Sequence, residues 1–384
     1  MTYLITGGAG FIGTHLCRHL LNEGHNVKIL DCFNTQIHGD QKKLPSDVSK
    51  DVELFTGDIR DRELLIKAIA KTNGIIHLAA ETGTGQSMYE IDRYFSVNVQ
   101  GTAVLLDILQ NHEISKSIET IVVASSRAIY GEGAYKCMVH GTIYPDSRNS
   151  IDLAMGKFDP GCPFCTCSIK VIPTNEIAPF KPMSVYGLTK QVQEQAILMF
   201  ARTRDINGIA LRYQNVYGPG QSLKNPYTGI LAVFSTLAKR GQDIEVYEDG
   251  QESRDFVYID DVINATVSAL KHKEKFVGGI NVGSGEATKI ETVAEEINSF
   301  FGKKSSIFTS GAFRIGDIRH NVADLSLAKD VLRFEPKTHF REGVSKFLQW
   351  AENETYVENI SYSNSVNELT IRGLMGQAKI KKYE

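Results

Sequence analysis

The length and composition of this chain describe a folded globular protein with about two domains of ordinary size or one large α/β unit. It has 384 residues, of which 42% are hydrophobic and 23% are charged, and this balance is typical of soluble domains. The net charge of -3 gives no electrostatic footprint for nucleic acid, so we expect no nucleic-acid partner. No apolar run is long enough for a bilayer and no charged leader precedes the first strand-like residues. We therefore expect a cytoplasmic protein with no membrane partner.

The first thirty residues carry the most informative pattern. "TYLITGGAGFIGTHLCRHLLNEGHNVKILD" has the pattern of a strand, a glycine turn, a helix and a second strand that ends at Asp31. Gly7, Gly10 and Gly13 have the spacing G-x-x-G-x-x-G, which lets the backbone approach a pyrophosphate at the helix N-terminus. Asp31 can accept hydrogen bonds from an adenosine ribose and repel a 2′-phosphate, which favours NAD over NADP. A glycine turn that serves only chain reversal is the alternative.

Strand and helix patterns continue to alternate beyond this motif. "VELFTGDIRD", "GIIHLAAETG" and "ETIVVASSRAIYG" have strand character, and "SVNVQGTAVLLDILQ" has a helical pattern. This alternation predicts an α/β fold, a doubly wound parallel Rossmann sheet with helices on both faces. Ligands of such sheets bind at the carboxyl ends of the strands, so Ser125, Ser126 and the segment through Tyr130 are site candidates.

A tyrosine and a lysine lie four residues apart in the periodic segment "SVYGLTKQVQEQAILMF". Tyr186 and Lys190 therefore share one face of the predicted helix. An ammonium beside a phenol stabilises the phenolate and lowers its pKa, and an oxidised nicotinamide acts in the same direction, which would make Tyr186 a general base for a substrate hydroxyl. The alternative is a surface tyrosine beside a solvated lysine.

The order of these motifs resembles a known family. "GGAGFIG", "GDIRD", "HLAA", "SSRAIYG" and "YGLTK" are similar to motifs of the extended short-chain dehydrogenase/reductases, and the resemblance extends from Met1 to about Trp350. "LRYQNVYGPGQ", "GQESRDFVYIDDV", "NVGSGEATKI" and "RIGDIRHNVADLSLAK" resemble segments of nucleotide-sugar 4-epimerases of the UDP-glucose 4-epimerase type. The resemblance implies NAD as cofactor, a nucleotide sugar as substrate and a homodimer.

The resemblance also implies roles for individual residues. The catalytic residues would be Ser126, Tyr186 and Lys190. The cofactor-binding residues would be Gly7, Gly10, Phe11, Ile12, Gly13, Asp31, Asp58, Ile59, Ala79, Ala80, Asn98, Tyr186 and Lys190. The substrate-binding residues would be Ser126, Arg127, Asn215, Arg254, Arg314 and Asp317. Arginine forks match phosphate oxygens and a carboxylate can accept from ribose hydroxyls, although ordinary surface salt bridges remain the alternative for Arg254 and Arg314.

Three departures from the family pattern affect the expected reaction. Family members that eliminate water carry an Asp-Glu pair directly after the catalytic hydroxyl residue, where this chain has Arg127 and Ala128. This chain therefore lacks the acid and the base that the elimination of water requires. Thr82 replaces a lysine of some 4-epimerases, and Gln214 replaces a common aromatic residue, so details of the cofactor and sugar pockets differ.

Four of the six cysteines lie between Tyr130 and Tyr186, in an insertion relative to UDP-glucose epimerases. Cys137-x-x-His140 and Cys162-x-x-Cys165 form two short knuckles that together offer a tetrahedral structural zinc site, with Cys167 as a spare or alternative ligand. Unconnected buried or reactive thiols are the alternative. Similar insertions occur in a subset that resembles dTDP-L-rhamnose 4-epimerases, which points to a dTDP-6-deoxysugar.

The expected organisation follows from the order of these segments. We expect a Rossmann domain at 1–212, with the cysteine-rich insertion at 132–178 and a return near 255–275. We expect a nucleotide-sugar lobe at 213–254 and 276–350, and a tail at 351–384 that serves packing or oligomer contact. The expected reaction is NAD-dependent C4 epimerisation of a UDP- or dTDP-hexose or 6-deoxyhexose through a 4-keto intermediate. The alternatives are an NAD-dependent nucleotide-sugar dehydrogenase or decarboxylase, and a nonenzymatic NAD-binding scaffold with a zinc insertion for a partner.

Overall fold

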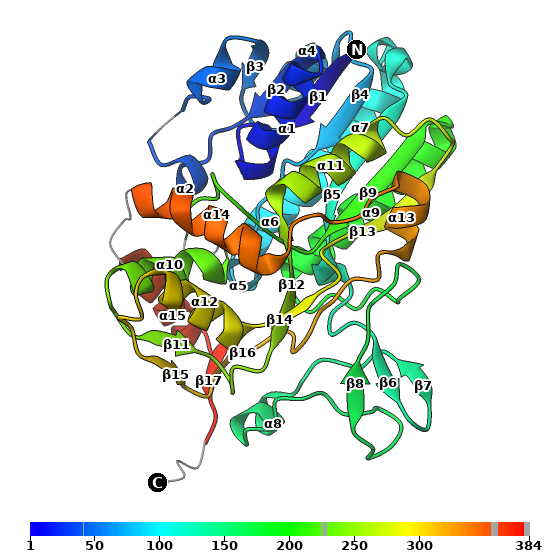
Figure 1. Cartoon of the computed structure of the whole chain (residues 1–384). Helices are drawn as coiled ribbons and strands as arrows, with labels where there is room; N and C mark the ends of the chain where they lie inside the picture. The colour runs from blue at the N-terminus through cyan, green and yellow to red at the C-terminus, as the bar shows by residue number, and fades with distance from the viewer. Residues whose placement is uncertain (41, 224, 226–228, 355–359, 380–384) are drawn as a thin grey trace.

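The expected doubly wound sheet is confirmed in a computed structural model, which describes residues 1–40, 42–223, 225, 229–354 and 360–379 (Figure 1). Every pair of neighbouring strands in its seven-stranded sheet is parallel. The strands are, in spatial order, β13 (Val277–Val282), β9 (Asn207–Tyr213), β5 (Thr120–Ser126), β4 (Gly74–His77), β1 (Thr2–Thr6), β2 (Asn26–Asp31) and β3 (Val52–Thr56). Because β13 belongs to this sheet, the sheet includes part of the range expected for the sugar lobe.

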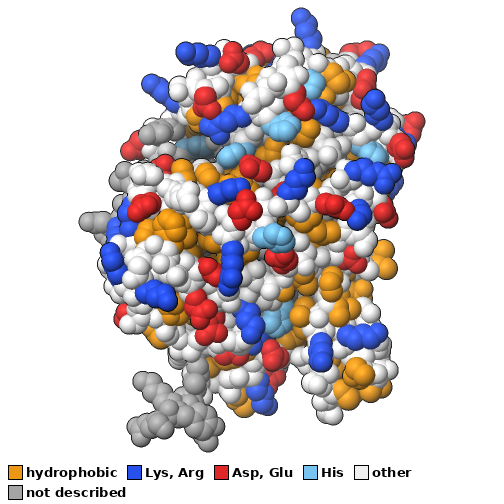
Figure 2. All heavy atoms as spheres, in the orientation of Figure 1, with side chains coloured by type: hydrophobic (Ala, Val, Ile, Leu, Met, Phe, Trp, Pro, Cys, Tyr) orange, Lys and Arg blue, Asp and Glu red, His pale blue; other side chains and the backbone are white. Residues whose placement is uncertain are grey.

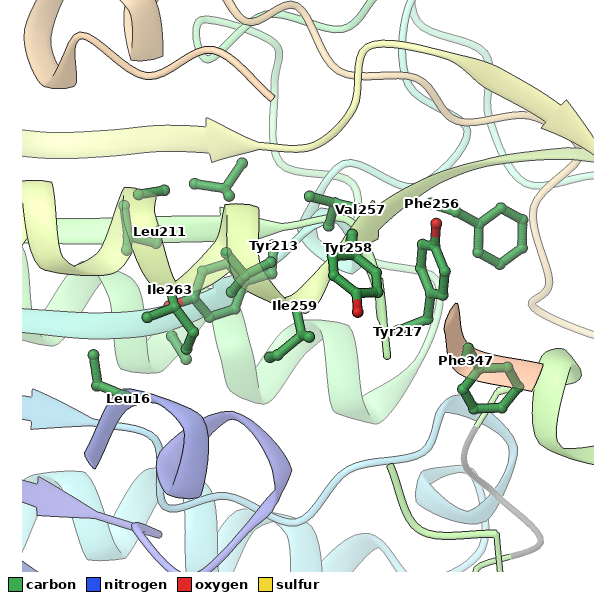
Figure 3. Close-up of a cluster of buried hydrophobic side chains, with 14 of the residues drawn as sticks. Leu16, Leu211, Tyr213, Tyr217, Phe256, Val257, Tyr258, Ile259, Ile263 and Phe347 are labelled. Carbon is green, nitrogen blue, oxygen red and sulfur yellow. The ribbon is translucent and has the colours of Figure 1, made fainter. Parts of the chain in front are cut away.

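Alternate residues of the central strands pack against helices on opposite faces. Ile5 of β1 packs in the cluster that contains α1 (Phe11–Asn22) and α11 (Ile259–Leu270), whereas Leu4 packs in the cluster of α4 (Arg62–Ile69), α7 (Gly101–Asn111) and α9 (Val185–Arg204). Figure 3 shows part of the first cluster, where Leu16 of α1 and Ile263 of α11 come together with β9. Strands buried on both faces need continuous apolar runs, which "YLI" and "TIVVA" supply.

A second lobe shares this core. It contains a three-stranded sheet of β10 (Asn215–Tyr217), β12 (Ser253–Tyr258) and β14 (Ala287–Lys289), and the pair β11 (Ile244–Val246) and β15 (Ile307–Thr309). The helices α10 (Ile230–Lys239), α12 (Ile290–Phe300) and α14 (Phe340–Asn353) pack beside these strands. Tyr217, Phe256 and Phe347, labelled in Figure 3, belong to the same buried cluster as Leu16. The lobe and the Rossmann sheet are therefore joined by one continuous core.

The insertion and the tail lie beside the second lobe. The insertion contains β6 (Tyr135–Cys137), β7 (Gly141–Ile143) and β8 (Ile169–Val171) in one small antiparallel sheet, and α8 (Ser150–Ala154). It projects at the lower right of Figure 1. The tail contains α15 (Ile360–Ile371) and β17 (Met375–Gln377), which pairs with β16 (Ala312–Arg314). Residues 355–359 and 380–384 of the predicted tail lie outside the described residues.

The surface has mixed charge. Basic and acidic side chains are interspersed over the face drawn in Figure 2. Within the described residues, none of the helices combines the length and the apolar character that a membrane span requires.

Candidate active site

A cleft of about 940 Å³ opens at the carboxyl ends of β1, β2, β4 and β5. Asn34, which no quoted motif contains, and Gln221, which ends the segment "LRYQNVYGPGQ" but was given no role, line it together with most of the predicted site. The predicted residues in its lining are Gly7, Gly10, Phe11, Ile12, Gly13, Asp31, Asp58, Ile59, Ala79, Ala80, Ser126, Tyr186 and Lys190. The structure therefore brings the predicted cofactor and catalytic residues to one edge of the sheet, where ligands of this fold class bind.

The glycine loop connects β1 to α1 without space for side chains. Gly7 has a φ of +71°, and a Cβ there would lie 2.8 Å from the backbone nitrogen of Ala79. A Cβ at Gly13 would lie 2.6 Å from the Cα of Gly8. Gly10 is the N-cap of α1, so the first N–H groups of that helix face the loop. This tight turn at a helix N-terminus fits a pyrophosphate.

Asp31 is buried at the end of β2 and is held by the backbone on both sides. Its carboxylate accepts hydrogen bonds from the N–H of Ala9 at 2.9 Å and of Phe33 at 2.8 Å. Asp58 instead forms an ion pair with Arg60 at 2.6 Å at the cleft's edge. Asp31 thus fixes the glycine loop relative to β2 while it lines the cleft.

The predicted catalytic residues come from two elements. Ser126 ends β5, and its hydroxyl accepts a hydrogen bond from the N–H of Ala128 at 3.2 Å. Tyr186 and Lys190 lie in the first turns of α9, which begins after Ser184, whose hydroxyl caps the helix by accepting from the N–H of Gly187 at 3.1 Å. The cap sets the start of the helix and so the face on which Tyr186 and Lys190 lie.

Burial is the largest influence on the pKa values of Tyr186 and Lys190. It raises the pKa of Tyr186, although a hydrogen bond with Ser126 and the charge of Arg127 act in the opposite direction. Burial lowers the pKa of Lys190 to about 7, opposed by the Glu194 carboxylate. The sequence predicted that Lys190 and an oxidised nicotinamide lower the pKa of Tyr186. The protein's own groups have the opposite net effect, so this direction is wrong for them, because burial disfavours the phenolate more than Ser126 and Arg127 stabilise it.

A polar network lies behind the catalytic helix face. The ammonium of Lys190 donates to Gln193 Oε1 at 2.8 Å, and Gln193 donates to Thr102 Oγ1 at 2.9 Å. Glu194 forms an ion pair with Arg212 at 2.6 Å. These contacts tie α9 to α7 and β9 and fix the position of Lys190.

Asn98 is buried behind the cleft and is not part of its lining. Its side-chain oxygen accepts from the N–H of Glu81 at 2.7 Å, and its amide donates to the carbonyl of Glu81 at 3.1 Å and to Thr189 Oγ1 at 3.0 Å. Asn98 therefore connects the segment after β4 to α9. Its predicted cofactor contact stays a prediction.

The predicted substrate residues other than Ser126 lie outside the lining of the main cleft. Arg254 donates to Asp317 Oδ1 at 3.0 Å, and the guanidinium of Arg314 lies 5.0 Å from the ring centre of Tyr247. Burial raises the pKa of Asp317, but the charges of Arg254, Arg314 and Arg127 outweigh this effect and hold the pKa below its usual value. Burial lowers the pKa of Arg127 to about 10, and Arg254 acts in the same direction. This concentration of positive charge suits a diphosphate.

Two neighbouring side chains at the start of β10 present buried oxygens. Within the described part of the chain, neither Gln214 Oε1 nor Asn215 Oδ1 has a hydrogen-bond partner. Gln214 lines the main cleft, whereas Asn215 does not. A buried acceptor without a partner is costly, so both oxygens remain available to accept a hydrogen bond.

The four predicted metal ligands converge at one point in the insertion. The ligand atoms of Cys137, His140, Cys162 and Cys165 all lie within 4.8 Å of one another. The Sγ atoms of Cys137 and Cys165 are 3.7 Å apart, and His140 Nδ1 lies 3.6 Å from Cys137 Sγ. Tetrahedral zinc with bonds of about 2.3 Å to sulfur separates its sulfur ligands by about 3.8 Å. Backbone N–H groups of His140 and Val139 lower the pKa of Cys137 to about 6, which favours a thiolate ligand.

Sequence reasoning missed the charged residues that surround Asp317. Arg148 donates to the carbonyl of Asp317 at 3.0 Å and to the carboxylate of Glu248 at 2.8 Å. Arg319 is 2% exposed and pairs with Asp159 at 2.7 Å. Arg319 follows directly in the "RIGDIRH" segment that supplied Arg314 and Asp317, so its position was visible, but nothing in the sequence indicated burial.

Comparison with known proteins agrees with this arrangement. Residues 4–147 match the GDP-mannose 4,6 dehydratase family model, and residues 166–283 match the NAD dependent epimerase/dehydratase family model. A dTDP-L-rhamnose 4-epimerase of Burkholderia thailandensis is 38% identical over 355 residues, which are 91% of this chain and 95% of that protein.

Solved structures share the fold over nearly the same length. The UDP-N-acetylglucosamine 4-epimerase of Methanobrevibacter ruminantium M1, in complex with UDP-N-acetylmuramic acid, has a TM-score of 0.74 at 25% identity and covers 92% of this chain and 99% of that one. MoeE5, in complex with UDP-glucose and NAD, has a TM-score of 0.71 at 27% identity with the same coverage. The chain belongs to the NAD dependent epimerase/dehydratase family, among the extended short-chain dehydrogenase/reductases.

Proposed function

We propose that this chain is an NAD-dependent isomerase that inverts C4 of a nucleotide-activated sugar, with a dTDP-6-deoxyhexose as its substrate. The observation that carries the proposal is the convergence of Ser126, Tyr186 and Lys190 with the glycine loop in one cleft. A protein that only binds a cofactor as a scaffold has no use for this set. The likeness over 91% of the chain to a dTDP-L-rhamnose 4-epimerase supports the choice of nucleotide and sugar.

The residues of the site have separate tasks in this reaction. Tyr186 takes the proton of the C4 hydroxyl and returns it after inversion, and Ser126 hydrogen-bonds the same oxygen. NAD bound at the loop of Gly7, Gly10 and Gly13 would accept the C4 hydride and return it to the opposite face of the 4-keto sugar, and its positive charge would favour the phenolate of Tyr186. Lys190 is held by Gln193 and lines the same cleft as the glycine loop. The 4-keto sugar rotates in the pocket and presents its other face, while Arg254, Arg314 and Asp317 hold the nucleotide.

Dehydration does not fit these residues. Loss of water from C5 and C6 needs an acid and a base beside the reacting carbons, and Arg127 and Ala128 occupy the positions where dehydratases carry them. Burial and Arg254 lower the pKa of Arg127 to about 10, so Arg127 stays charged near neutral pH. Arg127 therefore acts on the substrate as a cation and not as a base.

Turnover without added cofactor separates the epimerase from its alternatives. Purified protein is incubated with UDP-, dTDP- and GDP-sugars without added NAD, and products are identified by NMR. We expect a mixture of C4 epimers, most rapidly from dTDP-L-rhamnose, because each cycle restores the oxidised cofactor. Steady accumulation of free NADH would instead identify a dehydrogenase or decarboxylase. Binding of NAD with no product from any sugar would favour the scaffold.

We also propose that Cys137, His140, Cys162 and Cys165 bind one structural zinc ion. The four ligand atoms fill a tetrahedral set and lie within 4.8 Å of one another, so no position remains for a substrate. Cys167 is exposed and lies outside this set. Cys162→Ser should release the zinc and lower thermal stability and substrate affinity, while NAD binding survives because the glycine loop lies on the main sheet. Metal analysis that finds no zinc in fully active wild-type protein would contradict the site.

A homodimer remains our proposal for the oligomeric state. Ile91 of α6 (Ile91–Tyr94), and Leu188 and Met199 of α9, are large apolar side chains that are 38% to 65% exposed. Helices with such faces are suited to pair with those of a second copy. Light scattering of the wild-type protein, compared with Met199→Glu, tests this arrangement: a monomer in both samples would contradict it.

A further inference from the structure

The loop that carries the proposed nucleotide contacts is held by residues of the insertion. Arg148 lies in the insertion, and its guanidinium donates to the carbonyl of Asp317 at 3.0 Å. The same guanidinium donates to the carbonyl of Phe158 at 3.0 Å and forms ion pairs with Glu132 at 3.1 Å and Glu248 at 2.8 Å. One side chain therefore joins the insertion, the second lobe and the Asp317 backbone.

Arg319, which lies in the loop itself, also contacts residues of the insertion. The backbone N–H of Arg319 donates to Glu132 Oε2 at 2.8 Å, and its guanidinium pairs with Asp159 at 2.7 Å. Arg319 also shares Glu248 with Arg148, at 3.0 Å. From the opposite side Arg254 donates to the carbonyl of Ile318 at 2.8 Å. The backbone at 317–319 is thus bonded from both sides.

Arg148, Glu132 and Glu248 are charged and buried, so their ion pairs depend strongly on the positions of the partners. The side chains of Arg148, Glu132 and Glu248 are 3%, 0% and 6% exposed. Charges removed from water are costly unless each has a partner in good geometry, so small displacements of the loop are opposed. A planar guanidinium fixes several acceptors at once, which a flexible ammonium cannot do.

We propose that Arg148 is a positioning residue for nucleotide binding: the insertion sets the affinity for the nucleoside diphosphate by holding Asp317, and with it Arg314, in place. The proposal rests on the proposed function, because it takes Asp317 and Arg314 as nucleotide contacts. The insertion then acts on the substrate through the loop at 314–319. Tyr186 and Lys190 lie on a different element, α9, so binding and chemistry should respond separately.

Arg148→Lys tests this role with dTDP as the probe. Calorimetry should show a dTDP dissociation constant raised about tenfold or more, since a charged hydrogen-bond network loses its geometry. The KM for the nucleotide sugar should rise in parallel, while kcat, NAD content and zinc content stay within about twofold of wild type. Arg341→Lys is the matched control, because Arg341 is 82% exposed in an ordinary ion pair with Glu296.

A mutant cycle separates positioning from general support. If Arg148 acts through Asp317 and Arg314, adding Arg148→Lys to a protein that already carries Asp317→Asn and Arg314→Gln should weaken dTDP binding by no more than about twofold. Additive losses would overturn the proposal, and so would unchanged dTDP affinity in Arg148→Lys. Wild-type protein that binds neither UDP nor dTDP would instead refute the proposed function itself.

The isosteric variant Glu132→Gln covers the case in which Arg148→Lys does not fold. It retains an acceptor for the N–H of Arg319 and removes one charge that pairs with Arg148. We expect the same pattern, with weaker dTDP binding at unchanged NAD content and kcat. Simultaneous loss of NAD, zinc and dTDP in both variants would show that the cluster only supports folding, and the proposal would fail.

Discussion

Lys190 gives a stability prediction whose sign follows from its burial. Lys190 is 3% exposed, and burial lowers the pKa of its ammonium from 10.5 to about 7. Between these two pH values the unfolded chain binds more protons than the folded chain, so the wild-type fold gains stability as the pH rises through that window. Below pH 7 the penalty is largest. The gap between the two pKa values corresponds to about 5 kcal/mol, at roughly 1.4 kcal/mol per pH unit.

Lys190→Met removes this penalty and keeps a side chain of similar length. The variant also leaves Gln193 Oε1 without its donor, which costs about 1–3 kcal/mol. We therefore expect the variant to be about 2–4 kcal/mol more stable than wild type at pH 6. The gain should shrink between pH 7 and pH 10, because the wild-type lysine loses its proton there, and by pH 10 the variant should have no advantage.

Urea unfolding of cofactor-free protein from pH 6 to pH 10 measures this difference, since other titrating groups cancel between the two proteins. Lys136→Met is the matched control: Lys136 is exposed on β6, so its difference from wild type should be flat across the same range. Turnover of Lys190→Met should be lost even where the fold is more stable, as expected of a buried group that is kept for function at a cost in stability. A stability difference that is constant from pH 6 to pH 10 would refute the reasoning.

Three further substitutions test separate parts of the site. Tyr186→Phe should keep NAD and substrate binding and lose about 10²- to 10⁴-fold in kcat, whereas turnover within tenfold of wild type would remove Tyr186 from the mechanism. Gly13→Ala places a Cβ 2.6 Å from Gly8 Cα and should abolish NAD retention, while Gly161→Ala, with no atom within 4 Å of the added Cβ, should keep it. Gly376→Val places its Cβ 2.3 Å from Phe313 Cζ. It should disturb the pairing of β17 with β16 and raise the KM for the nucleotide sugar at unchanged NAD content; an unchanged KM would exclude the tail from substrate binding.

The features that the sequence predicted correctly depend on neighbours along the chain. Gly7, Gly10 and Gly13 act within one turn, and Tyr186 and Lys190 within one helix, so short spacing was enough to place them together. The parallel sheet followed from the alternation of strands and helices. The order of its strands did not: β13 joins the edge of the sheet beside β9, although 63 residues separate Tyr213 from Val277.

The features that the sequence did not predict depend on burial and on distant partners. Arg319 pairs with Asp159, which is 160 positions away, and no local pattern indicates such a contact. Asn98 also links the segment after β4 to α9 through its hydrogen bonds to Glu81 and Thr189, a role that its sequence context did not indicate. The pKa of Tyr186 was expected below its usual value because the sequence shows the nearby lysine but not the desolvation. In each case the deciding quantity is a three-dimensional environment.

The insertion and the tail meet at the strand that carries the proposed nucleotide contacts. Ala378 of the tail packs with Leu153 and Phe158 of the insertion and with Phe313 of β16. The N–H of Lys379 donates to the carbonyl of Ala154 at 3.0 Å, and β17 pairs with β16 so that Met375 lies opposite Arg314.

These contacts separate two properties of the proposed enzyme. Arg314 and Asp317 are held by the insertion and the tail, while Ser126 and Tyr186 are held by β5 and α9. If Arg314 and Asp317 bind the nucleotide, changes in the insertion or the tail should alter which nucleotide sugar is retained, and how tightly, without moving the groups proposed to act at C4. In that arrangement the reaction can stay constant while the substrate changes, because the residues proposed for substrate selection and those proposed for chemistry lie on different parts of the chain.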